Sequence, residues 1–440
     1  MIGPSSLHPR NLVRAEGMSA FRHRNYRLFF GGQAISLIGT WMQQVAQAWL
    51  VLELTHDPIW LGVVAAAQFV PVMILGLFAG VAADALPKRR VLIWTQVSMM
   101  VLAAILAALV LTSLVQVWMI LLLALLLGAV NAVDMPVRQS FSVELVGREG
   151  VGNAVALNSA MFNGARVVGP AAAGLAIGAF GVGPAFVINA LSFLAVIVGL
   201  QMMDEEALHL PTRVARPESA REVVRNLKEG LQYVRQTQVV LLAVVVVGAV
   251  ATVGMNFNVL IPAFAQDDLA SGAAGYGFLM AASGIGSLLA SVRLVFGGRP
   301  RPIRLVTGAL ILGGASLALA ITRDFPAAMA LMVLIGFGSI LMAATGNTTI
   351  QMAVPDHLRG RVMSVYTTVF SASVPIGGIA MGWVASTFGV PMAIAIGGAL
   401  TLVVGLGALA WGRGKTIDAV SIPQVEPRPS ATIPGAARTR

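Results

Sequence analysis

The sequence predicts an all-α polytopic membrane protein, with twelve transmembrane helices arranged as two six-helix bundles. Three observations predict this fold class: 57% of the 440 residues are hydrophobic, only 11% are Asp, Glu, Lys or Arg, and long apolar runs recur along the chain. Soluble domains carry about 25% charged residues. The composition therefore excludes a water-soluble globule with an ordinary surface, and it excludes a disordered chain.

Twelve apolar runs are long enough to cross a bilayer, which takes about 20 mostly apolar residues. Gly and Pro mark the joints between runs, as in the Gly-Val-Gly-Pro of residues 181–184. The expected spans are 27–53, 59–83, 91–111, 117–135, 153–180, 185–203, 239–263, 275–296, 305–321, 327–353, 362–388 and 392–411.

The positions of Lys and Arg predict the orientation of these spans. With the N-terminus inside, 27 of the 29 basic residues fall on inner segments, and the exceptions are Arg166 within a span and Arg323 in an outer loop. We therefore expect both termini to be cytoplasmic in a cell inner membrane. A cleaved signal or transit peptide is the alternative for the N-terminus, but the first apolar run is longer than a signal-peptide core.

The spans group as six plus six around a charged joint. In this joint Val223, Val224, Leu227, Leu231 and Val234 recur at helical spacing, which predicts an amphipathic helix that serves as a tether or as a binding element. The expected organisation is a cytoplasmic tail 1–25, a bundle 26–203, a linker 204–238 with this helix, a bundle 239–411 and a disordered cytoplasmic tail 412–440.

A Gly-x-x-x-Asp pattern followed by a basic cluster joins the second and third spans. It reads Gly80-Val-Ala-Ala-Asp84-Ala-Leu-Pro-Lys88-Arg89-Arg90, and a further acid, Asp134, lies near the inner end of span four. A glycine permits close helix packing, and an acid at a helix end can engage the amides of a facing helix. The pattern resembles the signature loop of the major facilitator superfamily, which implies that these residues form a cytoplasmic gate. The alternative is that Lys88–Arg90 only anchor the topology.

Span five contains Gly164-Ala-Arg166-Val-Val-Gly169-Pro170-Ala-Ala-Ala-Gly174. This stretch is similar to the Gly-Pro motif of exporters in that superfamily, where the bent helix packs tightly and seals one side of the pathway. A generic kinked helix is the alternative.

The wider chain resembles the branch with the enterobactin exporter and macrolide efflux proteins, through 24–29 (Arg-Asn-Tyr-Arg-Leu-Phe), 36–41, 153–159 and 354–362. That resemblance implies the major facilitator fold and proton-driven export of amphiphilic compounds.

Polar residues inside the spans are the candidates for the substrate pathway. Arg166 lies near mid-span, where a charge is costly unless it faces a cavity or a partner. A polar stripe on span one faces either the pathway or a neighbouring helix. The pathway candidates are Gln33, Gln43, Gln47, Asn163, Arg166 and Asn256, and the candidates for a proton site are Glu53 and Asp57, which as loop acids could equally be solvated.

Several other function classes are excluded. The chain has no cysteine, and its five histidines lie between apolar runs, so we expect no metal site and no cofactor. Gly414-Lys415-Thr416 lacks the earlier glycine of a phosphate loop, because position 409 is Leu409. We expect a non-enzymatic, monomeric secondary transporter whose partners are the bilayer, a small amphiphile such as a siderophore or drug, and a proton, without nucleic acid. A nutrient importer and a non-transporting receptor or scaffold remain alternatives.

Overall fold

A computed structural model describes residues 18–209, 220–297 and 301–413, and within these ranges regular structure is entirely helical. The side chains of 77–85, 148, 220–224 and 412–413 lie outside the described part, as do most of the two predicted tails. The elements are η1 (Ser19–Arg22), α2 (Arg24–Thr55), α3 (Ile59–Ala85), α4 (Lys88–Leu111), α5 (Val117–Phe180), α6 (Gly183–Gln201), α7 (Ala220–Gln236), α8 (Gln238–Gly254), α9 (Phe257–Ala263), η2 (Phe264–Asp268), α10 (Gly272–Phe296), α11 (Ile303–Ile321), α12 (Phe325–Ala353), α13 (Asp356–Phe388) and α14 (Val390–Arg413).

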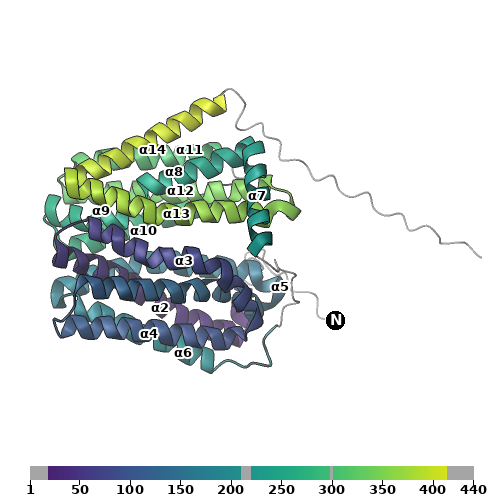
Figure 1. The fold of residues 1–440 in the computed structure, drawn as a ribbon. Helices are drawn as coiled ribbons and strands as arrows, with labels where there is room; N and C mark the ends of the chain where they lie inside the picture. Colours follow the sequence, from purple (N-terminus) through teal and green to yellow (C-terminus); the bar gives the residue numbers. More distant parts are fainter. Residues whose placement is uncertain (1–17, 210–219, 298–300, 414–440) are drawn as a thin grey trace, which may run out of the picture.

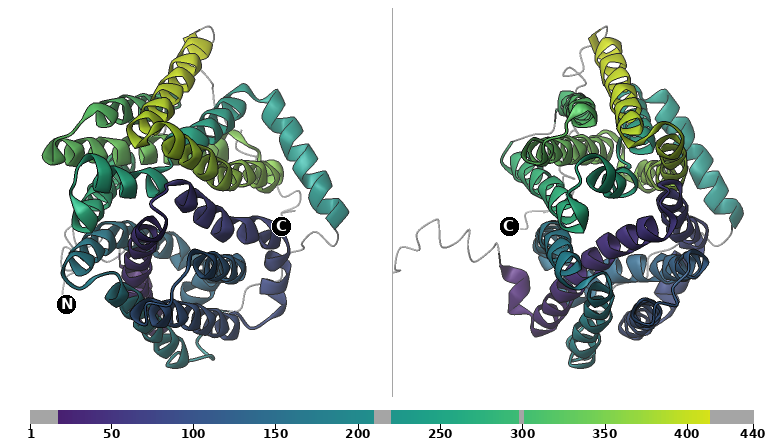
Figure 2. Two further views of the ribbon diagram at one scale, coloured as in Figure 1. Left: turned by 60° about the vertical axis from the view of Figure 1, so that its left-hand side comes forward. Right: turned by 90° about the vertical axis from the view of Figure 1, so that its left-hand side faces the viewer.

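The helices form two bundles that lie side by side with their long axes roughly aligned (Figures 1 and 2). Helices α2–α6 make the first bundle and α8–α14 the second, and α7 lies across one end of the second bundle (Figure 1). We call this end of the molecule the linker end. The opposite end, with residues 56–58, 112–116, 181–182, 322–324 and 389, is called the far end. The predicted fold class is confirmed.

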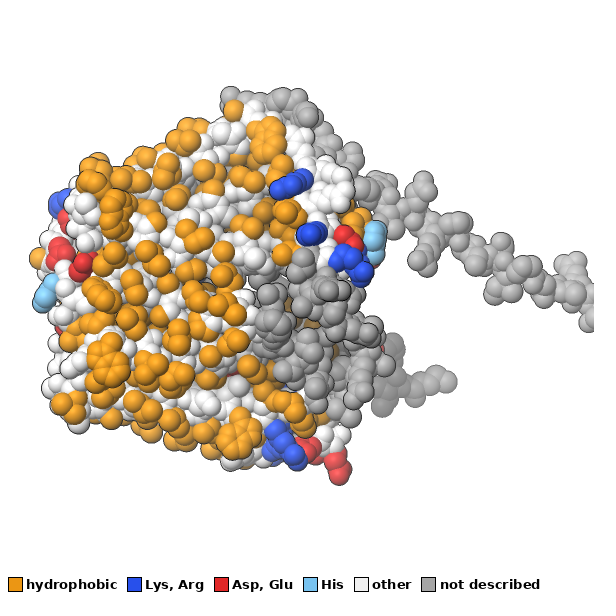
Figure 3. Space-filling model, in the orientation of Figure 1, with side chains coloured by type: hydrophobic (Ala, Val, Ile, Leu, Met, Phe, Trp, Pro, Cys, Tyr) orange, Lys and Arg blue, Asp and Glu red, His pale blue; other side chains and the backbone are white. Residues whose placement is uncertain are grey.

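Among the described residues, ten helical segments are long and apolar enough to cross a membrane. The two remaining predicted spans are helical as well, in α2 and in the second part of α5. Their mean hydropathy is lower because α2 carries four glutamines and the second part of α5 carries Asn163 and Arg166. Figure 3 shows apolar side chains over the flank of the molecule and charged side chains gathered at its two ends.

Two helices differ from the predicted spans. Helix α5 runs through the expected loop between spans four and five, and only Gly147, with φ 69°, leaves helical geometry. Span seven is instead broken in two at Met255 and Asn256, between α8 and α9. At this break the Asn256 Nδ2 donates to the Thr252 carbonyl at 2.6 Å. A side-chain amide thus donates a hydrogen bond to a backbone carbonyl near the end of α8.

The linker divides its contacts between the bundles. Before α7, the Asn25 side chain of the first bundle exchanges two hydrogen bonds with the backbone of Asp204, at 2.7 and 3.1 Å. In α7 itself, Glu229 pairs with Arg361 of α13 and the Tyr233 hydroxyl donates to the Ala353 carbonyl at 3.2 Å. Each end of the linker is therefore fastened to a different bundle.

Candidate functional site

The two bundles meet through close helix crossings in the half of the molecule nearer the far end. Helix α5 crosses α10 where a Cβ on Gly277 would lie 2.5 Å from the Pro170 carbonyl oxygen and 2.6 Å from the Gly174 Cα. Helix α3 crosses α13 where a Cβ on Gly62 would collide with the backbone of Gly378. Only glycine permits backbones to approach this closely.

The same stretch of α5 also packs against α2 of its own bundle. A Cβ on Gly169 would collide with the Trp41 Cβ and lie 3.0 Å from the Ile38 carbonyl oxygen. Gly174 faces α10, where its Cβ would lie 2.9 Å from the Ala274 carbonyl oxygen, whereas Gly164 has no neighbour within 4 Å. Gly169, Pro170 and Gly174 of the predicted motif thus bring three helices together, and Gly164 takes no part in this packing.

Arg166 lies one turn before Gly169, at the level where α2 and α5 approach. Its guanidinium carbon is 5.9 Å from the centre of the Trp41 ring. The Trp41 ring also meets the Phe162 ring edge-to-face, at 5.7 Å between centroids. Among the described residues, no acidic side chain pairs with Arg166 and no hydrogen bond occupies its donors. The Arg166 guanidinium is therefore a cation in the middle of the helix with an aromatic neighbour, and no side chain of the described part accepts a hydrogen bond from its N–H groups.

The second part of α5 has exposed positions on two opposite faces. Val168 and Leu175 occupy one face, and the opposite face carries the exposed Ser159 and Phe162 with the partly buried Asn163 and Arg166. A helix with an apolar exposed face and a polar exposed face turns the first to lipid and the second to a polar interior. Arg166 lies on the polar exposed face of α5, and we therefore infer that it faces away from lipid.

Helix α2 shows the same division. Gly31 and Ile35 are exposed on one face, and Thr40 and Gln44 are exposed on the opposite face. The polar residues predicted on this helix are only partly exposed. Gln43 is buried, and its side-chain oxygen accepts a hydrogen bond from the Asn189 Nδ2 of α6 at 2.6 Å. Gln47 is half-buried.

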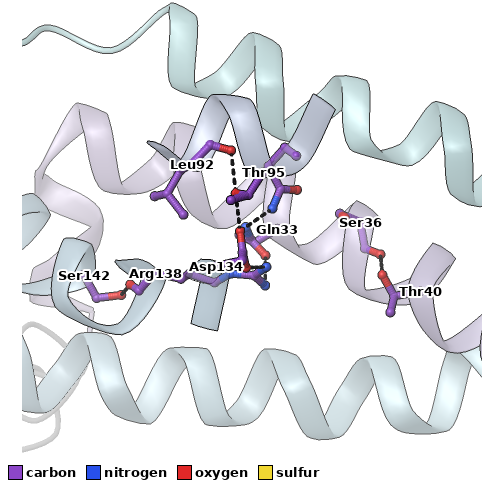
Figure 4. Close-up of polar contacts among 9 residues, drawn as sticks. Gln33, Ser36, Thr40, Leu92, Thr95, Asp134, Arg138 and Ser142 are labelled. Atoms are coloured by element: carbon purple, nitrogen blue, oxygen red, sulfur yellow. Dashed lines mark hydrogen bonds and ion pairs between the residues drawn. The ribbon is translucent and has the colours of Figure 1, made fainter. Parts of the chain in front are cut away.

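A second polar cluster is buried inside the first bundle, nearer the linker end (Figure 4). The fully buried Asp134 carboxylate accepts from the Thr95 hydroxyl at 2.7 Å and from the Gln96 amide at 3.0 Å. Arg138, one turn along α5, forms an ion pair with Asp134 and donates to the Gln33 Oε1 at 3.1 Å. Gln33 and Asp134 of the predicted set thus lie in one network, and α2, α4 and α5 each contribute to it.

Two of the three basic residues at the start of α4 pair with acids of α5 and of the segment that follows α6. Lys88 forms a buried ion pair with Glu144 of α5 at 2.6 Å. Arg89 pairs with Glu205 and donates to the Leu200 carbonyl at 2.6 Å at the end of α6. Arg90 is exposed. The side chains of the remaining predicted gate residues, Gly80 and Asp84, lie outside the described residues.

The other predicted residues each have a local partner. The Asn163 Nδ2 donates to the Ser159 carbonyl at 2.9 Å, and Asn256 is placed at the break between α8 and α9 described above. Glu53 accepts from the Trp49 indole at 2.6 Å. Asp57 accepts from the backbone amide of Ile59 at 3.0 Å, at the start of α3, so it acts there as a helix cap.

Sequence reasoning missed several partners that the fold supplies. Arg138 counts in the sequence only as a basic residue of an inner segment, although its spacing of four from Asp134 on a helix is a recognisable pair signal. Glu144, Thr95 and Asn189 carry no such local signal, because their partners lie 39 or more residues away. No group of three or more His, Asp and Glu residues suited to a metal is found among the described residues.

Comparisons with known proteins agree with this architecture. The family model described as transmembrane secretion effector matches residues 15–429. The Staphyloferrin A transporter of Staphylococcus aureus is 23% identical over 385 residues, which cover 86% of this chain and 94% of that protein. The multidrug efflux pump Tap of Mycolicibacterium fortuitum is 29% identical over 389 residues, covering 86% and 93%. Macrolide efflux protein A of Streptococcus pyogenes is 22% identical over 394 residues, covering 88% and 96%.

Solved structures share the fold at lower sequence identity. A POT family transporter in complex with 5-aminolevulinic acid superposes with a TM-score of 0.71 at 10% identity, covering 90% of this chain and 97% of that one. A mutant of the nucleoside transporter NupG gives a TM-score of 0.70 at 12% identity, covering 88% and 99%. At these identities the likeness is one of fold.

Proposed function

Since the chain belongs to the transmembrane secretion effector family, we propose that it is a proton-coupled exporter of small amphiphilic compounds, siderophores or drugs, and that it works by alternating access. The chain is a multi-pass membrane transporter of the major facilitator type and not an enzyme. Relatives named as efflux pumps support the outward direction of transport, and a relative named for a siderophore supports that class of cargo.

We place the linker end in the cytoplasm of a cell whose inner membrane holds the protein. Basic side chains of the described part gather at this end, whereas Arg323 lies at the far end beside Asp268, 3.4 Å away. Positive charge on the short loops favours the cytoplasmic side. This orientation places both termini in the cytoplasm. The proposed halves of the transporter are residues 26–203 and 239–411, and residues 204–238 connect them as a tether.

The observation that carries the proposal is the position of the contacts between the bundles. The close glycine crossings lie toward the far end. At the linker end Lys88 and Arg138 pair with acids of their own bundle, and Arg361 of α13 pairs with Glu229 of α7. A transporter whose two halves are packed together on the outer side faces inward. Rocking about the glycine crossings would open the outer side.

We assign the cytoplasmic gate to Gly80, Asp84, Lys88–Arg90 and Asp134. In the inward-facing arrangement Lys88 pairs within the first bundle and Arg89 pairs with Glu205 at the start of the tether. Both basic groups thus have partners outside the second bundle, as an open gate requires. Closure of the linker ends would bring the segment of residues 80–90 against the second bundle. The partly exposed Arg89 and the exposed Arg90 are then the basic residues available for new contacts.

The pathway follows the polar faces of α2 and α5. Asn163, Arg166 and Gln47 lie on these helices, and Asn256 lies at the break of span seven, the kind of discontinuity at which transporters bind their cargo. Gln33 and Gln43 belong to the same proposal, with their present hydrogen bonds inside the first bundle. Glu53 and Asp57, at the far end of α2, are the proposed proton acceptors.

Transport measurements in whole cells test the direction. A strain that lacks the gene is loaded with a macrolide or a siderophore, and outward flux is followed with the protein restored. We expect restored efflux and drug resistance, both lost in Asp84→Asn. The matched control is Asp324→Asn, because that loop acid caps α12 through the Ala327 amide at 2.9 Å and Asn caps equally well. Net uptake that depends on the protein would identify an importer instead.

A further inference from the structure

Arg166 is a cation near the middle of a helix that crosses the membrane, and it has no acidic partner among the described residues. The buried charged residues of the described part behave differently, since Lys88 pairs with Glu144 and Asp134 pairs with Arg138. A charge at this depth is retained when it serves a polar pathway or a ligand. The missing anion is therefore the feature to explain.

We propose that Arg166 and the Trp41 ring form the binding point for an organic anion, a carboxylate carried on a flat apolar body. The inference rests on the proposed function, because it names the chemical class of the exported compound. A guanidinium presents five N–H donors in a planar fork that fits a carboxylate with two parallel hydrogen bonds. No described residue occupies those donors.

The surroundings of Arg166 match the apolar part of such a ligand. Trp41 and Phe162 meet edge-to-face at 5.7 Å and leave Phe162 exposed, so an aromatic surface lies beside the cation. Thr40 and Gln44 are exposed one turn apart on α2, on the face that is opposite its lipid-facing positions. A ring system can pack on the aromatic pair while its carboxylate reaches the guanidinium and its other polar groups face Thr40 and Gln44.

The position of the cation is set by the glycines of the adjacent turn. Gly169 lets α5 approach α2 at Trp41, and on α10 a Cβ at Gly284 would lie 2.9 Å from the Arg166 carbonyl oxygen. Arg166 therefore lies at the crossing of the two bundles, where its environment changes when they rock. An anion bound there would be held between the two halves, as alternating access requires.

A set of three probes with one ring system and different charges tests the proposal. The protein is placed in nanodiscs of phosphatidylcholine, and calorimetry measures the binding of 2-naphthoate, 2-naphthalenemethanol and 2-naphthylmethylammonium, with empty nanodiscs subtracted. We expect naphthoate to bind most tightly and the ammonium most weakly. Arg166→Gln should weaken naphthoate binding by about tenfold or more, the scale of a charge-assisted hydrogen bond, and leave the alcohol within about twofold.

Two further variants separate binding from folding. Arg166→Lys should keep the preference for the anion with weaker binding, because lysine keeps the charge and loses the planar fork. Arg359→Gln, an exposed arginine paired with Asp356, is the matched control and should bind all three probes as the natural protein does. Equal affinity for the alcohol and naphthoate, equal loss of both in Arg166→Gln, or no binding of any probe would overturn the proposal.

The anion site and the proposed export function can be refuted separately. If vesicles with the natural protein expel a macrolide but the nanodiscs show no anion preference, the export function stands and the anion site is refuted. If naphthoate binds through Arg166 but no solute is expelled, the anion site stands and the export function is refuted.

Discussion

The glycine crossing between α5 and α10 gives the sharpest prediction. In Gly277→Ala the new methyl group would lie 2.5 Å from the Pro170 carbonyl oxygen and 2.6 Å from the Gly174 Cα. Both neighbours are backbone atoms of a helix, so no side chain can rotate away. The methyl group fits only if the two bundles separate at this crossing.

The size of the effect follows from those distances. Ordinary van der Waals contact begins at 3.4 Å, so relief requires a displacement of about 1 Å, and overpacking of this kind costs about 1–3 kcal/mol. That cost falls on the state in which the far end is closed. The equilibrium should shift toward the state with an open far end by about 5- to 150-fold.

Distance measurements between spin labels test the shift. The chain has no cysteine, so Leu114→Cys and Ile321→Cys place two labels without background. Both positions are exposed at the far end, one on each bundle. We expect Gly277→Ala to add a population with a longer label separation. Gly314→Ala is the control, because a Cβ there has no neighbour within 4 Å, and it should keep the original distribution.

An unchanged distance distribution in a folded Gly277→Ala protein would refute the reasoning. So would an equal change in Gly314→Ala, because the effect would then come from any added methyl group. A variant that unfolds is identified by its thermal melt, and Gly174→Ala, which meets the Ala274 carbonyl oxygen at 2.9 Å from the other side of the crossing, then serves as the second variant.

Three further predictions concern polar residues of the first bundle and their partners. Asp134→Asn removes the charge partner of the partly exposed Arg138 and weakens the hydrogen bonds that the fully buried carboxylate accepts, and we expect a loss of about 1–3 kcal/mol in a thermal unfolding assay; an unchanged melting temperature would show that the pair is not structural. Lys88→Gln and Glu144→Gln should each destabilise by about 3–5 kcal/mol, and the double variant should lose less than the sum, as a double-mutant cycle of melts would show; strict additivity would count against the buried pair. Asp57→Ala should lose about 1 kcal/mol through the missing cap while Asp57→Asn keeps it, and a loss of proton-dependent flux in Asp57→Asn alone would then report on proton transfer; equal melts of the two variants would contradict the capping role.

The fold was predictable because its determinants are local. A run of about 20 apolar residues specifies a span whatever lies elsewhere in the chain, and the charged joint between the sixth and seventh spans marks the division into two bundles. The amphipathic spacing in the linker likewise predicts α7, which begins at Ala220. The break at Asn256 was not predictable from hydropathy, because both sides of it are apolar and the interruption depends on the neighbouring helices.

The site was predictable only in part. Mid-span Arg166 and Gly169 are conspicuous in the sequence because a charge and a Gly-Pro pair are costly inside a membrane helix. Their shared neighbour Trp41 is not conspicuous, since a tryptophan in an apolar run has no unusual cost. Asn189, which donates a hydrogen bond to Gln43, is likewise not conspicuous in the sequence. Contacts between residues more than a hundred positions apart come from helix packing and are absent from local patterns.

Flux through purified protein tests the central claim most directly. The protein is reconstituted in liposomes with the linker end accessible from outside, and the uptake of a macrolide or a siderophore is followed with and without an imposed pH gradient. We expect transport from the linker end to the far end that accelerates when protons can move in the opposite direction and slows to a basal rate when the gradient is dissipated. Transport that is indifferent to the gradient would contradict proton coupling, and the absence of any transport would contradict the exporter itself.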